Sequence, residues 1–202
     1  MPDVEIDRPD LEKVREALVE RFGAVILETS YAHKELSFRV RKEDLLAVLG
    51  FLKTDQGFNA LNDMIGLDRG RDPGQSPGVQ FRGTRPEIQT TGEWRAEGSS
   101  LDHPAPLGEG RKRFSVLYQL YRFPGFQRVR VVVDLGEGEA VDSIVPLYRS
   151  ADWAEREIFD MFGIPFAGHQ DLRRIYMSDE FVGHPLRKDF PLEGNEECLS
   201  KI

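Results

Sequence analysis

The chain has 202 residues, a net charge of −8 at pH 7 and a pI near 5.1. This length suits one domain plus an appendage, and the acidic balance argues against nucleic-acid binding, which usually needs a basic surface. No apolar run approaches the roughly 18 residues of a membrane span, and the N-terminus lacks a signal-peptide pattern. The single cysteine, Cys198, can form no internal disulfide. We therefore expect a soluble protein of a reducing compartment that reaches a membrane only through partners.

Apolar periodicity predicts an α+β domain over residues 1–162. Its clearest feature is a hairpin, in which alternating apolar residues flank a turn at Pro124-Gly125. The predicted helices cover residues 9–22, 43–53 and 151–162; the predicted strands cover 24–28, 36–40, 58–67, 114–120 and 129–133, with a turn at 30–34. This order favours a mostly antiparallel sheet with helices on one side.

Residues 69–110 interrupt this pattern as a Pro/Gly-rich insertion. The insertion has few aliphatic residues and five prolines: Pro73, Pro77, Pro86, Pro104 and Pro106. A structureless stretch of that length inside a compact domain is usually functional or disordered. We expect a surface excursion, while Ile88 and Trp94 leave open a contact with a partner.

The last predicted helix contains charged residues that need ion-pair or hydrogen-bond partners. Gly163 follows the last periodic residue and ends the helix. Asp152, Arg156 and Asp160 share one face at the spacing of two successive i,i+4 ion pairs. Glu155 falls at the edge of the apolar face, where a carboxylate needs a partner to be tolerated.

Residues 163–202 form an extended C-terminal segment, and its part at 163–192 combines glycine and proline breakers with many apolar anchors. A flexible linker would be polar and poor in aromatics, so we expect an ordered strap. Its cations are matched by carboxylates: Arg173, Arg174, Arg187 and Lys188 against Asp171, Asp179, Glu180 and Asp189. This balance predicts directional, paired contacts. We expect the first half to dock on its own domain and residues 184–192 to lie on a partner.

The sequence indicates no reaction centre. The histidines (His33, His103, His169 and His184) include no pair at the i,i+4 spacing of two ligands on one helix. A metal site or a hydrolase centre using His169 and His184 is conceivable, but loop histidines more often pair with carboxylates or backbone. Glu155 and Glu157 point in different directions on a helix, which disfavours an acid–base pair. One cysteine cannot hold an iron–sulfur cluster in the ordinary way. We expect no catalytic, cofactor-binding or metal-binding residue in this chain.

Two blocks near the C-terminus resemble a known family. They are E-R-E-I-F-D-M-F-G-I-P-F-A-G-H-Q-D-L-R-R-I-Y at 155–176 and G-H-P-L-R-K-D-F-P-L at 183–192. In this order they are similar to the C subunit of bacterial NADH:quinone oxidoreductase, the 30 kDa or iron–sulfur protein 3 component of respiratory complex I. Residues 58–68 and 114–134 fit more loosely, and 69–110 is longer than is usual for the family.

The resemblance implies a scaffold subunit of the peripheral arm, with FMN, iron–sulfur clusters and quinone bound by other subunits. The implied partners are the large quinone-pocket subunit, called the D subunit, and the neighbouring B and I subunits, and nucleic acid is not among them. Membrane contact would come only through the complex, on the cytoplasmic side of the cell inner membrane. The alternative is the equivalent subunit of a related membrane-bound hydrogenase or dehydrogenase with another electron donor.

The resemblance also implies a structural or interface role for a set of charged side chains. They are Glu155, Arg156, Glu157, Asp160, His169, Arg173, Arg174, His184, Arg187, Lys188 and Asp189. We expect Glu155 to be buried and bonded to Arg173 or Arg174, and residues 184–192 to lie on the large subunit.

Overall fold

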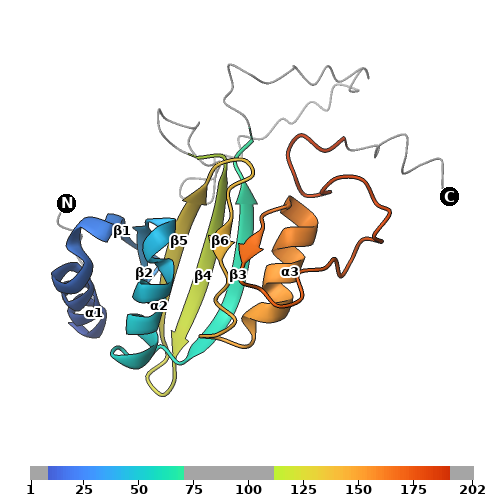
Figure 1. Ribbon diagram of the computed structural model, residues 1–202. Coiled ribbons are helices and arrows are strands. Elements are labelled where there is room, and N and C mark those ends of the chain that lie inside the picture. The colour runs from blue at the N-terminus through green and yellow to red at the C-terminus, as the bar shows by residue number, and fades with distance from the viewer. Residues whose placement is uncertain (1–8, 71–111, 192–202) are drawn as a thin grey trace, which may run out of the picture.

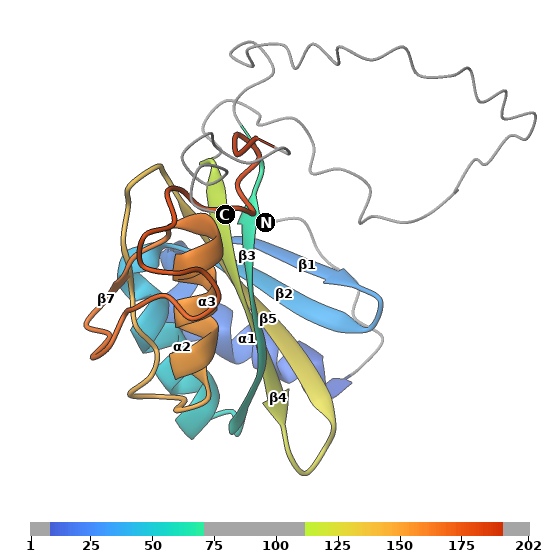
Figure 2. The same ribbon diagram turned by 90° about the vertical axis from the view of Figure 1, so that its right-hand side faces the viewer.

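The protein is described by a computed structural model, which covers residues 9–70 and 112–191. Cys198 and all but the first two residues of the predicted insertion at 69–110 lie outside the described residues. Three helices lie against one face of a five-stranded sheet, and an extended segment follows the last helix (Figures 1 and 2). This arrangement confirms the predicted α+β class.

The elements follow in an order close to the predicted one. The helices are α1 (Pro9–Phe22), α2 (Leu45–Thr54) and α3 (Ala151–Phe162), with short 3-10 turns at Gly23–Val25 and Lys42–Asp44. The strands are β1 (Ile26–Ala32), β2 (Glu35–Val40), β3 (Ala60–Asp68), β4 (Phe114–Arg122), β5 (Gln127–Leu135), β6 (Val141–Asp142) and β7 (Phe166–Ala167).

The main sheet has the strand order β1-β2-β5-β4-β3. The pairs β1–β2, β4–β5 and β3–β4 are antiparallel, whereas β2 and β5 are parallel. It follows that β2 and β3 run in the same direction, are joined by α2, and hold the β4–β5 hairpin between them. The remaining strands, β6 and β7, form a separate parallel pair beside α3 that the sequence did not reveal.

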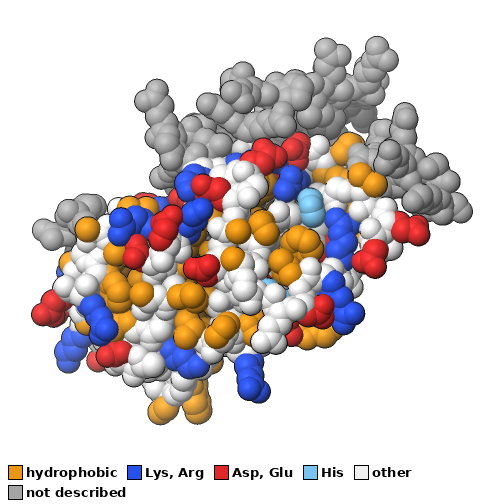
Figure 3. Space-filling view, viewed as in Figure 1, with side chains coloured by type: hydrophobic (Ala, Val, Ile, Leu, Met, Phe, Trp, Pro, Cys, Tyr) orange, Lys and Arg blue, Asp and Glu red, His pale blue; other side chains and the backbone are white. Residues whose placement is uncertain are grey.

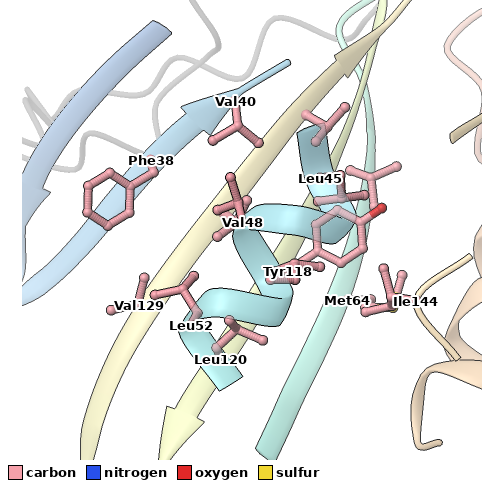
Figure 4. Close-up of a cluster of buried hydrophobic side chains, with 14 of the residues drawn as sticks. Phe38, Val40, Leu45, Val48, Leu52, Met64, Tyr118, Leu120, Val129 and Ile144 are labelled. Atoms are coloured by element: carbon pink, nitrogen blue, oxygen red, sulfur yellow. The ribbon is translucent and has the colours of Figure 1, made fainter. Parts of the chain in front are cut away.

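The core lies between the helices and one face of the sheet. In α2 the buried side chains Leu45, Val48, Leu49 and Leu52 have the i, i+3, i+4, i+7 spacing of one helical face, and Phe51 is buried beside them. They meet alternate residues of the strands, including Phe38, Tyr118 and Val129 (Figure 4). Full burial of such a side chain contributes about 1.5–3 kcal/mol, so this layer holds the domain together.

A glycine lets α3 approach the sheet closely. A Cβ atom on Gly66 of β3 would lie 2.7 Å from the Phe162 ring and 3.1 Å from Ile158. The first contact is closer than real Cβ atoms allow without a shift of the neighbouring group. Gly66 therefore fixes α3 against the edge of the sheet, and this is the helix on which the C-terminal segment docks.

The first strand is misplaced in the prediction. A strand was expected at 24–28 and a turn at 30–34, whereas β1 runs over Ile26–Ala32 and the turn is His33-Lys34 alone. The reason is that β1 is an edge strand whose side chains are mostly exposed, so it lacks a strong apolar alternation. Both turn residues have positive φ, at 53° and 63°, as a two-residue hairpin turn requires.

The sheet face opposite the helices is polar. Near the end of β5 the Asp134 carboxylate forms ion pairs with Arg39 and with Arg69, the latter at 3.0 Å, and accepts a hydrogen bond from Ser115. Burial alone would raise the pKa of Asp134, but these three partners outweigh it and lower the pKa below its usual range. Charge pairs therefore order this end of the face, next to the apolar row of Ile65, Leu117 and Val132.

Candidate interaction site: the strap on helix α3

The ordered part of the C-terminal segment, residues 163–191, is here called the strap. It leaves α3, passes through β7, and returns along the helix to reach the ends of the sheet strands (Figures 1 and 2). Its side chains and backbone bind α3 and the sheet at the following places.

Asp160 of α3 is the main anchor of the strap. Its Oδ2 atom accepts hydrogen bonds from the successive backbone amides of Ile175, Tyr176 and Met177, at 3.1, 2.8 and 2.9 Å. The Nε atom of Arg174 lies 3.4 Å from Oδ1. The Asp160 side chain is completely buried, so these donors replace water around a charged group.

The pKa of Asp160 shows that these donors prevail. Burial alone would raise the pKa of a carboxyl, but the amides and Arg174 outweigh it and hold the pKa of Asp160 below its usual range. The carboxylate is therefore ionised at neutral pH. A buried charge of this kind stabilises the strap only while all its partners stay in place.

The strap also completes the C-terminal end of α3. The last carbonyl groups of a helix have no partner within the helix. Here the carbonyl of Asp160 accepts from His184 Nδ1 at 2.9 Å, that of Met161 from the Leu186 amide at 3.1 Å, and that of Phe162 from Arg187 Nε at 2.5 Å. Residues 184–187 therefore act as the cap of the helix.

Gly163 makes this cap possible. Its φ is +70°, a left-handed conformation typical of a glycine that ends a helix. A Cβ atom at this position would also lie 2.4 Å from Nε2 of His184 and 2.6 Å from the Arg187 guanidinium. The glycine is thus needed both for the turn and for the room that the strap occupies, which confirms its predicted role as the helix end.

A buried charge cluster holds the end of the strap to the sheet. Arg113, just before β4, binds both carboxylate oxygens of Asp68 at the end of β3, at 2.9 and 3.1 Å. The strap joins this pair, because the Lys188 amide donates to Asp68 at 2.9 Å and Asp189 lies 2.8 Å from Arg113. Both Asp68 and Arg113 are buried. We call Asp68, Arg113 and Asp189 the clamp.

The two adjacent arginines of the strap have different roles. Arg174 donates to the carbonyls of Phe181 and Gly183 at 2.7 and 2.6 Å, and so closes the loop between them. Arg173 is exposed and its side chain pairs with Asp171, at 3.0 Å. An exposed pair of this kind contributes little to stability, so Arg174 is the residue that orders the strap.

The structure buries Glu155, as predicted, but the predicted partner is wrong. Its Oε1 atom accepts from the backbone amide of Ile144 at 2.7 Å, while Arg174 binds Asp160 and Arg173 stays exposed. Burial raises the pKa of Glu155, although the amide and a hydrogen bond from Ser143 oppose the shift. Glu155 therefore ties α3 to the loop before it and makes no ion pair with the strap arginines.

The expected ion pairs along α3 are replaced by contacts with the strap. Asp152 lies 3.0 Å from Nε2 of His169, whose Nδ1 accepts from the Asp171 amide. Arg156 donates to the carbonyl of Arg173 and lies over the ring of Trp153 at 4.9 Å. The i,i+4 prediction was wrong because the strap offers buried partners that a solvated helix face lacks.

The predicted division of the strap is also wrong in one respect. Its second half, at residues 184–189, contacts α3 and the clamp as closely as the first half contacts Asp160. Contact of this half with a large partner stays a prediction that concerns only its outer surface. Of the remaining predicted residues, Glu157 is exposed on α3 and Lys188 is exposed on the strap.

Sequence reasoning missed Asp68 and Arg113. They flank the insertion at 69–110 and are separated by 45 positions in the chain, so no local pattern relates them. A weak signal was available, since a buried aspartate ends the apolar strand β3 and an arginine precedes β4. Such residues at the two ends of an insertion suggest an ion pair that closes it.

The contacts of the strap are internal to the domain. Within the described residues, no group of three or more acidic, histidine or cysteine side chains could hold a metal ion, and no helix is long and apolar enough to cross a bilayer. The charged signature side chains instead bind backbone groups and one another. The fold and the strap thus define a small α+β domain with an ordered C-terminal extension.

The chain belongs to the family described as respiratory-chain NADH dehydrogenase, 30 Kd subunit, which it matches over residues 38–196. It is 35% identical over 179 residues to the C subunit of NADH-quinone oxidoreductase from Geotalea uraniireducens, covering 88% of this chain and 85% of the relative. It is 36% identical over 188 residues to the C 2 subunit from Rhizobium etli, covering 92% and 80%. A C/D subunit from Bdellovibrio bacteriovorus matches 95% of this chain at 32% identity, but this is only 28% of that relative.

Two solved structures share the fold. A trypsin-resistant fragment (1-134) of Nqo5 has a TM-score of 0.54 and 26% identity, and the match covers 81% of this chain and 99% of the fragment. A chain of the archaeal membrane-bound sulfane sulfur reductase has a TM-score of 0.61, with 90% of this chain and 85% of that chain covered. At 16% identity the second match shows the fold alone, and it does not favour a complex with another electron donor.

Proposed function

We propose that this chain is a non-redox scaffold subunit in the peripheral arm of a proton-translocating NADH:quinone oxidoreductase. Its family and its relatives, named as C subunits of that enzyme, support this role. The observation that carries the proposal is the use of the signature residues, which fix the strap on α3 and on the sheet. They build a rigid surface, and their polar groups are occupied in holding it.

The outer surface of the strap is suited to a protein partner. Tyr176, Leu186 and Val182 are 61%, 55% and 48% exposed, and Trp153 of α3 is 64% exposed. Hydrophobic side chains also reach the surface over the strap, on the right of Figure 3. Exposed apolar side chains that are held in place and surrounded by charges are typical of protein interfaces.

The main partner in this proposal is the large quinone-pocket subunit, the D subunit, with the B and I subunits as further neighbours. The C/D relative of Bdellovibrio supports the first assignment, because its name places a C part and a D part in one chain. Covalent fusion keeps two parts at high effective concentration, which benefits parts that work in contact.

Cofactors in this proposal belong to other subunits, which bind FMN, the iron–sulfur clusters and quinone. The single cysteine of the chain supports this, because clusters are usually held by several thiolates. The protein would lie on the cytoplasmic side of the cell inner membrane and contact the membrane only through the complex. Metal and flavin analysis of the purified chain tests this part, and stoichiometric iron, zinc or flavin would contradict it.

The scaffold role is tested with the exposed apolar surface. Tyr176→Ser combined with Leu186→Ser should leave the chain folded but lower the yield of assembled complex and its NADH:quinone reductase activity together. Leu27→Ser is the control, because Leu27 is 57% exposed on β1, away from the strap. Full assembly of the double variant would show that this surface does not bind the partner. Failure of the tagged wild-type chain to co-purify with other subunits would refute the role itself.

A further inference from the structure

A second surface lies on the side of the sheet opposite the strap-bearing helix. A cavity of about 620 Å³ opens between the β1–β2 turn and the β4–β5 hairpin. It is bordered by His33, Lys34, Tyr121, Phe126, Arg128 and Arg130, together with Glu35 and Gln119. Because Gln119 and Arg130 alternate with core residues of their strands, this cavity lies on the polar sheet face. We call it the hairpin groove.

The hairpin groove is basic in an acidic protein. It contains Lys34, Arg128 and Arg130 against the single carboxylate of Glu35, whereas the whole chain has a net charge of −8. Glu35 is already bound by Arg130 and Gln119. Lys34 and Arg128 are exposed and form no ion pair within the described residues. The groove therefore presents an excess of positive charge to solvent.

Aromatic side chains stand at the edge of the same groove. Phe126 is 66% exposed and lies edge-to-face with Tyr121 at 6.1 Å and with Phe123 at 5.7 Å, and Phe123 is itself 57% exposed. Orange side chains project from the hairpin at the foot of Figure 3. Aromatic residues and arginines side by side are the composition of energetically important interface positions.

Backbone strain in the described chain is concentrated around this groove. The residues other than glycine with positive φ are His33 at 53°, Lys34 at 63° and Phe126 at 56°, and all three border the groove. A two-residue hairpin turn normally uses Asn and Gly at such positions. Residues with longer side chains are strained there, and strained residues cluster at binding sites. The strain thus points to the side chains themselves as the useful feature.

The chemistry of the groove selects the kind of occupant. A small-molecule pocket is usually lined by apolar side chains and encloses its ligand. The hairpin groove is instead lined mainly by charged and polar side chains, and two of its three cations, Lys34 and Arg128, are exposed. Charge complementarity favours an acidic occupant, and the exposed Phe126 ring favours one that also brings an apolar side chain.

We propose that the hairpin groove is a second docking surface, which binds an extended, Asp/Glu-rich segment of a neighbouring protein of the same complex. The inference rests on the proposed function, because the segment is supplied within that complex. The strap lies beside α3, whereas the β1–β2 turn that borders the groove lies away from it, across the sheet (Figure 2). A chain with both surfaces would contact two neighbouring subunits of the complex instead of one.

The test uses a photo-reactive phenylalanine analogue in place of Phe126, in the full chain within the intact complex. Irradiation followed by mass spectrometry should give an adduct with an Asp/Glu-rich segment of another protein of the complex. Lys34→Glu with Arg128→Glu should lower the adduct yield roughly tenfold, because two attractions become repulsions. Lys13→Glu with Arg149→Glu is the matched control; both residues are exposed, and the adduct yield should not change.

The outcomes separate this inference from the proposed function. A chain that never enters the complex refutes the proposed function. If the chain assembles normally but the probe reacts with its own chain, with lipid, with a neutral or basic segment, or with nothing, only the groove assignment is refuted. An unchanged adduct yield in the charge-reversal variant, with an acidic adduct present, would equally overturn the electrostatic basis of the assignment.

Discussion

Replacement of Asp160 by asparagine should release the strap from helix α3 while the domain stays folded. The substitution keeps the shape of the side chain and one oxygen acceptor but removes the charge. That charge is shared by three backbone amides of the strap and by Arg174. Because the pKa of Asp160 lies below its ordinary 3.8, the carboxylate contributes fully at neutral pH, and the contribution is lost only as the pH falls below that value.

The size of the effect follows from the number of bonds. A hydrogen bond to a charged group contributes about 1.5–3 kcal/mol, against about 0.5–1.5 kcal/mol for a neutral one. A loss of roughly 1 kcal/mol at each of the three amides gives about 3 kcal/mol in the free energy of strap opening. Since about 1.4 kcal/mol corresponds to a factor of ten, the open population should rise by roughly 100-fold.

Trypsin cleavage after Arg174 and Arg187 reports this opening, because both side chains are bound in the closed strap. When opening and closing are fast, the cleavage rate follows the open population. The matched control is Asp171→Asn on the strap, whose carboxylate pairs with the exposed Arg173; its cleavage rate should change less than about fivefold.

Three results would refute the reasoning. Equal cleavage rates in wild type and Asp160→Asn would mean that the strap does not depend on this carboxylate. Complete loss of the thermal unfolding transition in Asp160→Asn, with no folded domain left at room temperature, would mean that strap and domain unfold as one unit. Cleavage that accelerates in the Asp171→Asn control to the same degree would show that any loss of strap charge suffices.

Three further substitutions test other contacts. Gly163→Ala should lower the unfolding free energy by about 2–4 kcal/mol, because strain at positive φ adds to a clash with the strap. The control Gly168→Ala, at a glycine with positive φ but open space around it, should lower the unfolding free energy by only about 1 kcal/mol. Equal losses in the two variants would disprove the clash. Arg113→Ala leaves the buried carboxylate of Asp68 without its ion-pair partner and should lower the free energy of unfolding in urea by about 3–5 kcal/mol. The control Arg41→Ala removes an exposed pair and should lower it by less than about 1 kcal/mol. A loss as small in Arg113→Ala as in the control would contradict the buried clamp. The raised pKa of Glu155 means that the folded state binds the proton more tightly, so stability falls as the pH rises from 4.5 through the folded pKa. Glu155→Gln should therefore flatten the dependence of stability on pH above 4.5. An unchanged slope would assign this pH dependence to other groups.

The parts of the fold that the sequence predicted are those with local patterns. The β4–β5 hairpin was found because apolar residues recur at every second position of both strands and a Pro-Gly turn lies between them. The end of α3 was found because a glycine with positive φ is the usual helix stop. The parallel pairing of β2 with β5 was not predicted, since it depends on a long-range choice of neighbours that alternation alone does not encode.

The candidate site was predicted in composition but not in pairing. The signature residues do gather around α3, yet most bind backbone groups. Every residue except proline has a backbone amide, so the sequence cannot show which amide will be the partner. Glu155 illustrates this, because its partner is the amide of Ile144 and not an arginine that the sequence would display. The clamp was missed for another reason, namely that its members are distant in the chain.

The completion of α3 by the strap has a consequence for protein synthesis. The carbonyls of Asp160 and Phe162 receive their donors from side chains 24 and 25 positions later in the chain. A nascent chain that has released only α3 from the ribosome therefore has a helix whose last turn ends in unpaired carbonyl groups. The end of the helix becomes stable only once residue 187 has emerged, so the final turn of α3 should be among the last parts of the domain to form during translation.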